Sequence, residues 1–502
     1  MSEMAAMFYK IKGQKYVPPF LFFCLAFAVR TIFALCFADI PGSGDAAGKL
    51  HAAYCMGTIA PGQVRNLWWI LVFPSVDWLP LYYWINSIVS FTFKGNYIAL
   101  QLTPAVFGSL NVALVYWAVK RLFGRFQIVS ALTICFLPCA VWLSAMTMTE
   151  VYYLTFAIPA VVFAISYRSS GGKTNYVLLV LSVVAASLIR YEGWLLLCGI
   201  SVSLVLYAKG TKNKIIAAIS CIPLFAGCFL IFFQQYMEGN ELLYGVTQSD
   251  RDVAAFKIAG EVSTLNNAHE FLYGTIPLAI LGFLYAWVRF RKLETSTQQY
   301  LIICSVPFMG LLAKFFTGTL LVEDRYVFIH SVFLMPLGFM LIADAVKRFS
   351  VNAIAPAFYF LPLLIAVILF PYGSKLTGEG LKQPTWFNAA VQQLRTVHSG
   401  IIFLDKMPDQ AEYSLVVKAQ LPGSKYSVLK CPEVVILNEI KSSKVVMDIL
   451  IRNSDCASKI YYLSTTQTTS SFADSVTNLC DSLGYYSKEP LTTPGLHVFL
   501  KN

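Results

Sequence analysis

The chain has 502 residues, of which 57% are hydrophobic and only 13% are charged, and its mean hydropathy is +0.62. This composition excludes an ordinary soluble globular protein and indicates a polytopic membrane protein. The formal net charge of +11 would suggest a nucleic-acid partner in a soluble chain. Membrane topology explains the charge instead, so no nucleic-acid partner is expected.

Apolar runs separated by turn and charge signals predict about eleven transmembrane helices. The N-terminal region lacks the short apolar core and small-residue cleavage site of a signal peptide, so the first run is expected to be a retained span. The predicted spans lie near 17–38, 97–119, 127–145, 151–167, 175–189, 192–207, 215–235, 272–288, 299–316, 326–343 and 352–371.

Basic residues concentrate in alternate loops between these spans. One set of loops holds sixteen Lys and Arg against three acids, whereas the other set holds eight basic residues against thirteen acids. The excess of basic residues on the cytoplasmic side predicts a cytoplasmic N-terminus. An odd number of spans then places the C-terminus outside, in the periplasm, the cell exterior or a lumen.

The composition predicts two domains. Residues 1–371 form a transmembrane domain with a long first outer loop at 39–96, and residues 372–502 form a small α/β domain outside the membrane. In the second domain, apolar runs alternate with helix-like stretches at 384–398 and 470–484. The apolar runs are 401–404, 434–437, 460–463 and 496–500. One disulfide among Cys431, Cys456 and Cys480 is left open.

Ionisable residues near the outer ends of the spans indicate that chemistry takes place on the outer face, because such groups are costly at the membrane. Asp45 follows a Gly-Ser-Gly turn and precedes a helix-like run. It is either a helix cap or a general base. Glu150 lies in a short turn between the third and fourth spans and allows the same two interpretations, a cap or a catalytic acid.

Residues 175–207 are apolar except for Arg190-Tyr191-Glu192. One helix of this length would measure about 50 Å, too long for a bilayer core of about 30 Å, whereas two helices would reach only about 23 Å each. The tip of the hairpin is therefore expected below the outer interface, inside a protein cavity. Arg190 is either a self-paired turn residue or a phosphate-binding arginine with a polar partner.

Other basic residues lie near the same face. Arg325 follows Glu323 and Asp324 at the start of a span and is either an interface anchor or a site residue. Lys314 is either a site residue or a snorkelling side chain. Arg30, inside the first span, either snorkels outward or faces the same cavity. The planar guanidinium fork of arginine matches phosphate oxygens.

The aromatic stretch 78–84 contains a proline and suits an interfacial helix that stacks on a sugar or lies among lipid headgroups. Motifs for a metal centre, a nucleophilic serine or a nucleotide phosphate are absent, and the five histidines have no ligand spacing. No cofactor is expected, and a divalent-metal requirement is left open.

Taken in chain order, the motifs resemble those of the GT-C superfamily of polyprenyl-phosphate-sugar glycosyltransferases. The similarity is greatest to the branch of protein O-mannosyltransferases and lipid A aminoarabinose transferases, and it covers roughly residues 17–345. It departs from the family at Ala46, where the family has Glu, and at Trp78-Leu-Pro80, where the family has His-Pro-Pro. The matching segments are Gly44-Asp45-Ala-Ala with His51-Ala-Ala-Tyr-Cys-Met56, Trp78-Leu-Pro-Leu-Tyr-Tyr83, Leu102-Thr-Pro with Arg121-Leu-Phe-Gly124, and Arg325-Tyr with Pro336-Leu.

The resemblance implies inverting transfer of a sugar from a polyprenyl phosphate to an acceptor hydroxyl on a protein, a glycolipid or a polysaccharide. Asp45 would activate the acceptor, and Glu150 would be the second acid. The residues implied at the donor phosphate are Arg190, Arg325, Arg65 and Lys314, and those implied at the substrates are Trp78, Tyr82, Tyr83, Glu192, Asp324 and His51. Two rival interpretations are a transporter or flippase of a lipid-linked substrate and a non-catalytic scaffold.

Overall fold

The computed structural model describes residues 17–37, 49–51, 53–54, 79–237, 276–317, 324–348, 364, 401–404, 433–436, 459–463, 485–488 and 496–501. The chain forms two compact units. The first comprises Met1–Phe33, Pro74–Tyr82 and Pro104–Lys375, and the second comprises Ala34–Phe73, Tyr83–Thr103 and Leu376–Asn502. The division at residue 371 stays a prediction.

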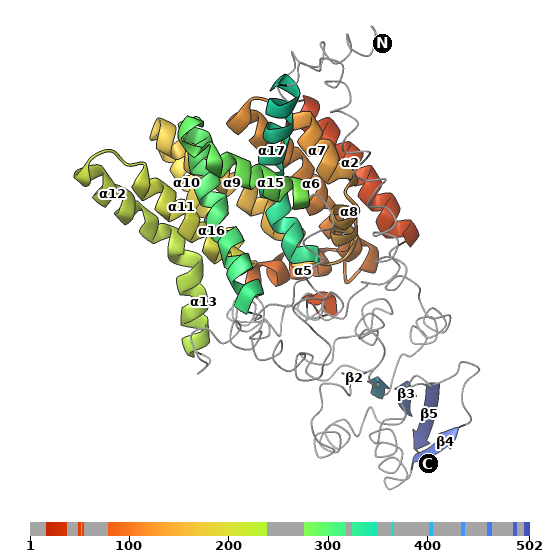
Figure 1. The fold of residues 1–502 in the computed structure, drawn as a ribbon. Helices are drawn as coiled ribbons and strands as arrows, with labels where there is room; N and C mark the ends of the chain where they lie inside the picture. The colour runs from red at the N-terminus through yellow and green to blue at the C-terminus, as the bar shows by residue number, and fades with distance from the viewer. Residues whose placement is uncertain are drawn as a thin grey trace. The chain divides into compact units, whose positions relative to one another are not determined.

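From α5 to α13 the helices follow one another with connections of a few residues (Figure 1). Their bounds are α2 Val17–Phe37, α5 Pro80–Thr92, α6 Tyr97–Phe123, α7 Gln127–Phe136, α8 Pro138–Ala145, α9 Thr149–Ser170, α10 Lys173–Ser187, α11 Glu192–Leu206, α12 Thr211–Cys221, η1 Ile222–Phe225, α13 Ala226–Met237, α15 Ile276–Val288, η3 Phe290–Lys292, α16 Thr295–Thr317 and α17 Asp324–Arg348.

The helices confirm an integral multi-pass membrane protein. Within the described ranges, six helical stretches are long and apolar enough to cross a bilayer, and the bent pair α7–α8 makes a seventh. The apolar helices α10, α11 and α15 are shorter. Ten of the eleven predicted segments lie on helices. The segment 352–371 lies outside the described residues except for Leu364, so the number of spans stays a prediction.

The span predicted at 127–145 is broken. Leu137 adopts an extended conformation, and the axes of α7 and α8 differ by 58°. Proline at 138 explains the break, because its ring cannot donate a backbone hydrogen bond and it disfavours helical geometry in the preceding residue. Arg30 of α2 is buried against this break. The prediction that Arg30 snorkels outward or faces the cavity of the other arginines is therefore wrong.

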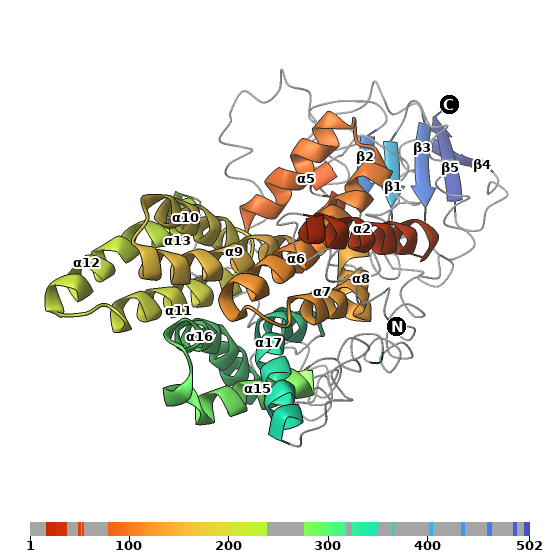
Figure 2. The same cartoon turned by 90° about the horizontal axis from the view of Figure 1, so that it is seen from above.

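The hairpin predicted at 175–207 consists of α10 and α11, which have 15 residues each and are joined by a tight turn. Helix α9 packs on α10, and α16 packs on α11 (Figure 2). At Gly199, a Cβ atom would lie 2.5 Å from the carbonyl oxygen of Ile303, so glycine allows the backbones of α11 and α16 to approach closely.

Helices α15 and α17 pack against each other at two glycines. A Cβ atom added at Gly282 would lie 2.1 Å from the backbone nitrogen of Gly338, so neither position tolerates a side chain without movement of the backbone. Arg289, just after α15, forms an ion pair of 2.6 Å with Asp344 of α17, and Tyr285 donates a hydrogen bond to the same carboxylate at 2.8 Å. These polar contacts join the two helices at the end opposite the start of α17.

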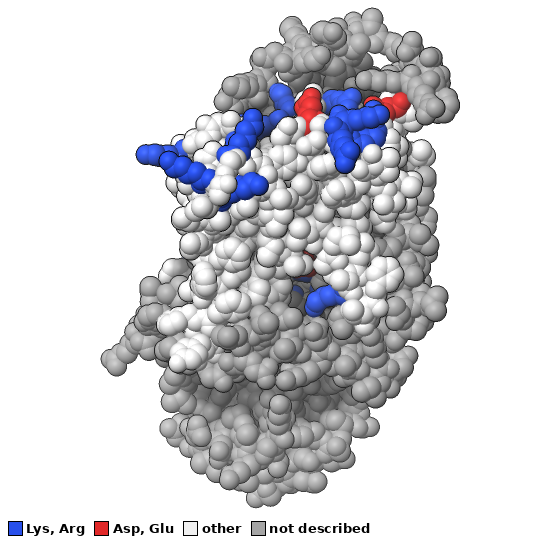
Figure 3. All heavy atoms as spheres, turned by 60° about the vertical axis from the view of Figure 1, so that its left-hand side comes forward, with Lys and Arg blue, Asp and Glu red and all other residues white. Residues whose placement is uncertain are grey.

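Basic side chains gather at one end of the helices, above a broad band without charged side chains (Figure 3). The uncharged band is consistent with a membrane-spanning surface. The residues of the predicted cytoplasmic loops that the structure shows exposed are Lys120, Arg121, Arg125, Lys173, Lys209, Lys212, Lys214, Arg291 and Lys292.

The described strands form one mixed sheet with the order β2-β1-β3-β5-β4. Strand β1 pairs in parallel with β2 and β3, whereas β5 is antiparallel to β3 and β4. The four predicted apolar runs lie on β1, β2, β3 and β5, and β4 was not predicted. The stretches 384–398 and 470–484 and the three tail cysteines lie outside the described residues. The strands are β1 Ile401–Leu404, β2 Glu433–Ile436, β3 Lys459–Leu463, β4 Tyr485–Lys488 and β5 Leu496–Lys501.

Candidate functional site

Glu150 lies in the first turn of α9, and its side chain is completely buried. A negative charge is favourable at a helix N-terminus, yet the carboxylate does not cap the helix, since its Oε1 atom accepts a hydrogen bond from Arg190 at 2.6 Å. The other oxygen, Oε2, is buried and accepts no hydrogen bond from the described residues. A buried acceptor left in this way is costly, and it leaves this oxygen able to accept a hydrogen bond from a further group.

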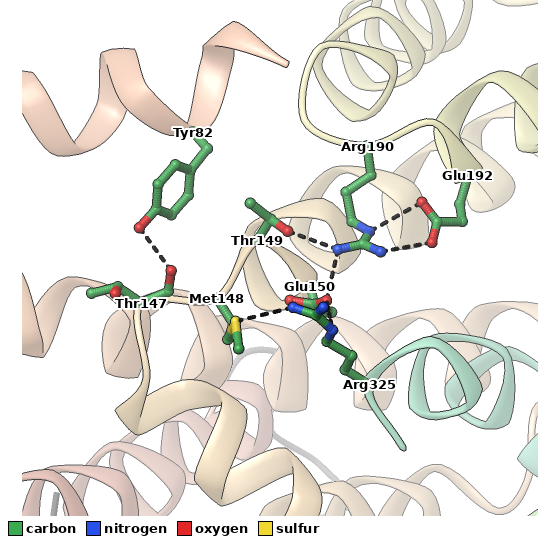
Figure 4. A network of polar contacts seen from close by, with 8 residues as sticks. All are labelled: Tyr82, Thr147, Met148, Thr149, Glu150, Arg190, Glu192 and Arg325. Atoms are coloured by element: carbon green, nitrogen blue, oxygen red, sulfur yellow. Dashed lines mark hydrogen bonds and ion pairs between the residues drawn. The ribbon is translucent and has the colours of Figure 1, made fainter. Parts of the chain in front are cut away.

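Arg190 lies at the tip of the α10–α11 hairpin and is only 7% exposed. Its Nε and Nη2 atoms donate to the two oxygens of Glu192 at 3.1 and 2.8 Å, which is the bidentate geometry expected of this pair. Its Nη1 atom donates to Glu150 at 2.6 Å and to the hydroxyl of Thr149 at 2.7 Å. Figure 4 shows the guanidinium between these groups.

The turn that presents Arg190 depends on glycine. The backbone nitrogen of Gly193 donates to the carbonyl oxygen of Arg190 at 3.0 Å, which closes the turn. A Cβ atom at Gly193 would lie 2.6 Å from the carbonyl oxygen of Ala186 in the preceding helix. The sequence Arg-Tyr-Glu-Gly thus combines the charged pair with the residue that lets the two helices meet.

Arg325 reaches the same carboxylate from the start of α17. Its Nε atom lies 3.9 Å from Oε1 of Glu150, and its Nη1 atom lies 3.7 Å from the sulfur of Met148. The ring of Tyr326 lies near both arginines, with its centroid 5.3 Å from Cζ of Arg190 and 5.2 Å from Cζ of Arg325. Both cations can therefore make cation–π contacts with the same ring.

Met146–Thr149 form the turn that links α8 to the site. The hydroxyl of Tyr82 donates to the carbonyl oxygen of Thr147 at 2.7 Å (Figure 4). The Tyr82 ring packs edge-on against Tyr152 of α9. The side chain of Tyr82 is fully buried. This geometry favours a supporting role for the Tyr82 hydroxyl, which fixes the turn that precedes Glu150.

The structure brings together three of the predicted site residues with Glu150, namely Arg190, Glu192 and Arg325. Lys314 lies half-buried in the last turn of α16 and contacts none of these four among the described contacts. His51 and Tyr83 are buried in the second unit. Asp45, Arg65 and Trp78 lie outside the described residues, as does the side chain of Asp324.

Sequence reasoning missed Thr149 and Tyr326 as members of the cluster. Each is adjacent in the sequence to a charged residue that was predicted for the site, and this adjacency was the signal that could have identified it. His330, one helical turn after Tyr326, lines a small cavity with Tyr153 and Cys304 beside the cluster. Among the described residues, no group of three or more His, Cys, Asp or Glu is placed to hold a metal ion.

The four charged residues have a defined electrostatic balance. Two arginines, which stay charged in proteins, face two carboxylates, so the formal charge of the cluster with both glutamates ionised is zero. The charges lie in a largely buried environment where unpaired ions would be strongly destabilising. The arrangement can bind a polar group at Glu150 and can stabilise negative charge at the arginines.

No family model matches the sequence, and no curated protein matches it. Solved structures do match. The crystal structure of ArnT from Cupriavidus metallidurans bound to undecaprenyl phosphate has a TM-score of 0.53 and 12% sequence identity, over 95% of this chain and 97% of that chain. The apo state of the same ArnT has the same TM-score and identity, over 99% and 98%. This chain therefore has the fold of ArnT.

Proposed function

We propose that the protein is a membrane glycosyltransferase that moves a sugar from a polyprenyl-phosphate donor to an acceptor hydroxyl. The observation that carries the proposal is the buried cluster of Glu150, Arg190, Glu192 and Arg325, in a fold shared with a protein solved with undecaprenyl phosphate. Carboxylates and arginines are the groups that this reaction needs, since one must accept a proton and another must stabilise a phosphate.

The proposed step is a single inverting displacement. The acceptor oxygen attacks the anomeric carbon, and the bond from that carbon to the phosphate oxygen breaks. The electron pair leaves with the phosphate, and the acceptor proton passes to Asp45 as general base. Glu150 is the second acid, and its free oxygen Oε2 suits a hydroxyl of the substrate.

Arg190 and Arg325 are proposed to stabilise the departing phosphate. Four of the five N–H donors of Arg190 are already engaged, so a phosphate that binds it through two donors must replace one of its partners, and we propose that it replaces the Glu192 carboxylate. Glu192 is the more exposed of the two glutamates, at 18%, and is therefore the exchangeable partner. Arg325, whose Nε atom lies 3.9 Å from Glu150, is proposed as the second arginine at the phosphate.

The reaction is proposed to occur at the outer face. Helix α10 begins at Lys173, beside the exposed basic residues, and ends before Arg190, so the cluster lies at the opposite end of this helix from the basic loops. Basic loops mark the cytoplasmic side, which supports a periplasmic, extracellular or lumenal site. The acceptor is proposed to be a protein, a glycolipid or a polysaccharide.

The remaining predicted contacts stay proposals. Arg65 and Lys314 are proposed at the donor phosphate, and Trp78, Tyr83, His51 and Asp324 are proposed at the substrates. Tyr82 is completely buried, and it is proposed to support the site by holding the turn that precedes Glu150.

The test is incubation of the purified protein in lipid vesicles with a polyprenyl-phosphate sugar and candidate acceptors, with release of free polyprenyl phosphate as the readout. Release should be seen with the wild type and should fall by roughly 10²–10⁴-fold in Asp45→Asn. Asp39→Asn, a change in the same loop region, is the matched control and should keep normal release. Movement of the intact donor between leaflets without release would instead favour a flippase.

A further inference from the structure

Arg30 of α2 is buried with only 1% of its surface exposed, and its hydrogen bonds go to the last turn of α7, to the last turn of α8 and to its own helix. Its Nη2 atom donates to the carbonyl oxygen of Ile134 at 3.0 Å, and Nη1 donates to that of Cys135 at 3.4 Å. Its Nε atom donates to the hydroxyl of Ser144 at 3.0 Å. Arg30 therefore contacts the last turns of both α7 and α8.

The carbonyl group closest to the Arg30 guanidinium is that of Ile134. It is also the carbonyl that Pro138 leaves without a helical hydrogen-bond donor. In an unbroken helix the backbone nitrogen of residue 138 would donate to the carbonyl oxygen of Ile134, four residues earlier. Proline has no such hydrogen. Within a membrane, water does not replace the lost bond, so another group of the protein must supply it.

The environment of Arg30 is arranged for this task. No carboxylate of the described residues forms an ion pair with it, and its charge faces the C-terminal end of α7, where the helix dipole is negative. Gly108 of α6 makes the space, because a Cβ atom there would lie 2.1 Å from Oγ of Ser144 and 3.0 Å from Nε of Arg30.

The break directs α8 toward the candidate site. Helix α8 ends at Ala145, and the next five residues carry the carbonyl held by Tyr82, the Met148 and Thr149 side chains, and Glu150 itself. We infer that Arg30 supplies the hydrogen bond to Ile134 that Pro138 removes and thereby fixes the direction of α8 and the position of Glu150. Arg30 is thus a positioning residue, and its effect on turnover rests on the proposed function.

The experiment compares Arg30→Met in two backgrounds, the wild type and Pro138→Ala, by melting temperature. Alanine restores the backbone donor at position 138, so the loss of melting temperature caused by Arg30→Met should be clearly smaller in the Pro138→Ala background. Equal losses in both backgrounds would overturn the inference. Arg121→Met is the matched control, because exposed Arg121 donates to Ser166 at 3.1 Å in the same manner without touching a helix break.

The positioning role is measured by cryo-electron microscopy and by kinetics. In Arg30→Met, the 58° angle between α7 and α8 should change and the Glu150–Arg190 contact of 2.6 Å should be lost. Turnover should fall about 100-fold with little change in the KM for the donor, since a shift of about 1 Å in a catalytic group has this effect. Arg30→Lys should restore part of the turnover, because an ammonium group can reach one carbonyl.

Two results separate this inference from the proposed function. An inactive wild type would remove the proposed function, while the melting and structural comparisons would still decide the role of Arg30. An unchanged helix angle and an intact Glu150–Arg190 contact in Arg30→Met would overturn the positioning role. If Arg30→Met yields no folded protein, Ser144→Ala removes the Arg30 bond to α8, together with the bond from the Ser144 hydroxyl to Ala140, and should produce a smaller shift of the same kind. No shift in Ser144→Ala would overturn the role.

Discussion

Glu150 and Arg190 are forty residues apart in the sequence, yet their side chains form an ion pair of 2.6 Å in which both partners are buried. The contact joins the start of α9 to the tip of the α10–α11 hairpin, so the charged pair also connects the α8–α9 turn with the α10–α11 turn. Removing one partner of such a pair leaves the other charge buried and unpaired. This change is more destabilising than replacing both partners with apolar residues.

Arg190→Ala is therefore expected to destabilise the protein by about 3–5 kcal/mol, as buried charge removal does in general. Arg190→Lys should recover only part of the loss, since lysine cannot make the bidentate contact with Glu192. Melting temperature and affinity for polyprenyl phosphate are to be measured on both variants. A phosphate-binding role also requires weaker lipid binding in the folded fraction, and unchanged affinity would leave Arg190 with a structural role alone.

Arg325→Ala should reduce stability less than Arg190→Ala does and should act mainly on the affinity for polyprenyl phosphate. Its ion pair with Glu150 measures 3.9 Å, so the loss of stability should be smaller than for Arg190→Ala. Its affinity for polyprenyl phosphate should fall roughly tenfold or more, because a hydrogen bond to a charged group contributes about 1.5–3 kcal/mol. Arg289→Ala breaks an exposed ion pair with Asp344 and serves as the control that should leave lipid binding intact.

Gly193→Ala should lower the melting temperature and the yield of folded protein, because the new methyl group would meet the backbone of Ala186 at 2.6 Å. Gly172→Ala is the matched control. The nearest atoms to a Cβ there are side-chain atoms at 3.5 Å, and the backbone at Gly172 has an ordinary negative φ. Equal stability of the two variants would show that the α10–α11 turn does not need glycine.

Gly282→Ala should separate α15 from α17, since its methyl group would meet the backbone of Gly338 at 2.1 Å. Gly310→Ala also creates a close contact, at 2.6 Å, but with the end of the flexible Leu195 side chain, which can move. Thermal unfolding should therefore detect a large loss for Gly282→Ala and a small one for Gly310→Ala. The reverse order would contradict the packing described for α15 and α17.

The topology is tested with a reporter that is active only in the cytoplasm. Fused after Asn502, it should be inactive, because the basic loops predict an external C-terminus. Fused after Gly210, in a predicted cytoplasmic loop, it should be active. Activity at Asn502 would reverse the proposed side of the tail.

Helices were largely predictable, whereas their contacts were not. Apolar length is a local property, so ten of the predicted apolar segments could be placed on helices from the sequence alone. The pairing of Arg190 depends on which helices pack together, and the sequence left both a self-paired turn and a phosphate site open. The structure shows Arg190 paired with its neighbour Glu192 and also with distant Glu150.

Arg30 and β4 show two reasons for the remaining errors. The role of Arg30 depends on a carbonyl made available by a proline more than one hundred residues later, which hydropathy does not detect. Strand β4 has the sequence Tyr-Tyr-Ser-Lys, which lacks the apolar run that marked the other strands, and it is stabilised by pairing with β5.

The charge balance of the cluster also affects the order in which the helices can assemble during synthesis. Glu150, Arg190 and Glu192 leave the ribosome together, within two successive helical hairpins, and carry a net charge of −1. Arg325 follows more than 130 residues later, so the nascent chain holds an uncompensated negative charge until α17 arrives. Helix α17 therefore supplies the positive charge that balances the charges of the earlier helices. A chain truncated before residue 324 would have to retain the negative charge in the membrane or leave its first helices incompletely assembled.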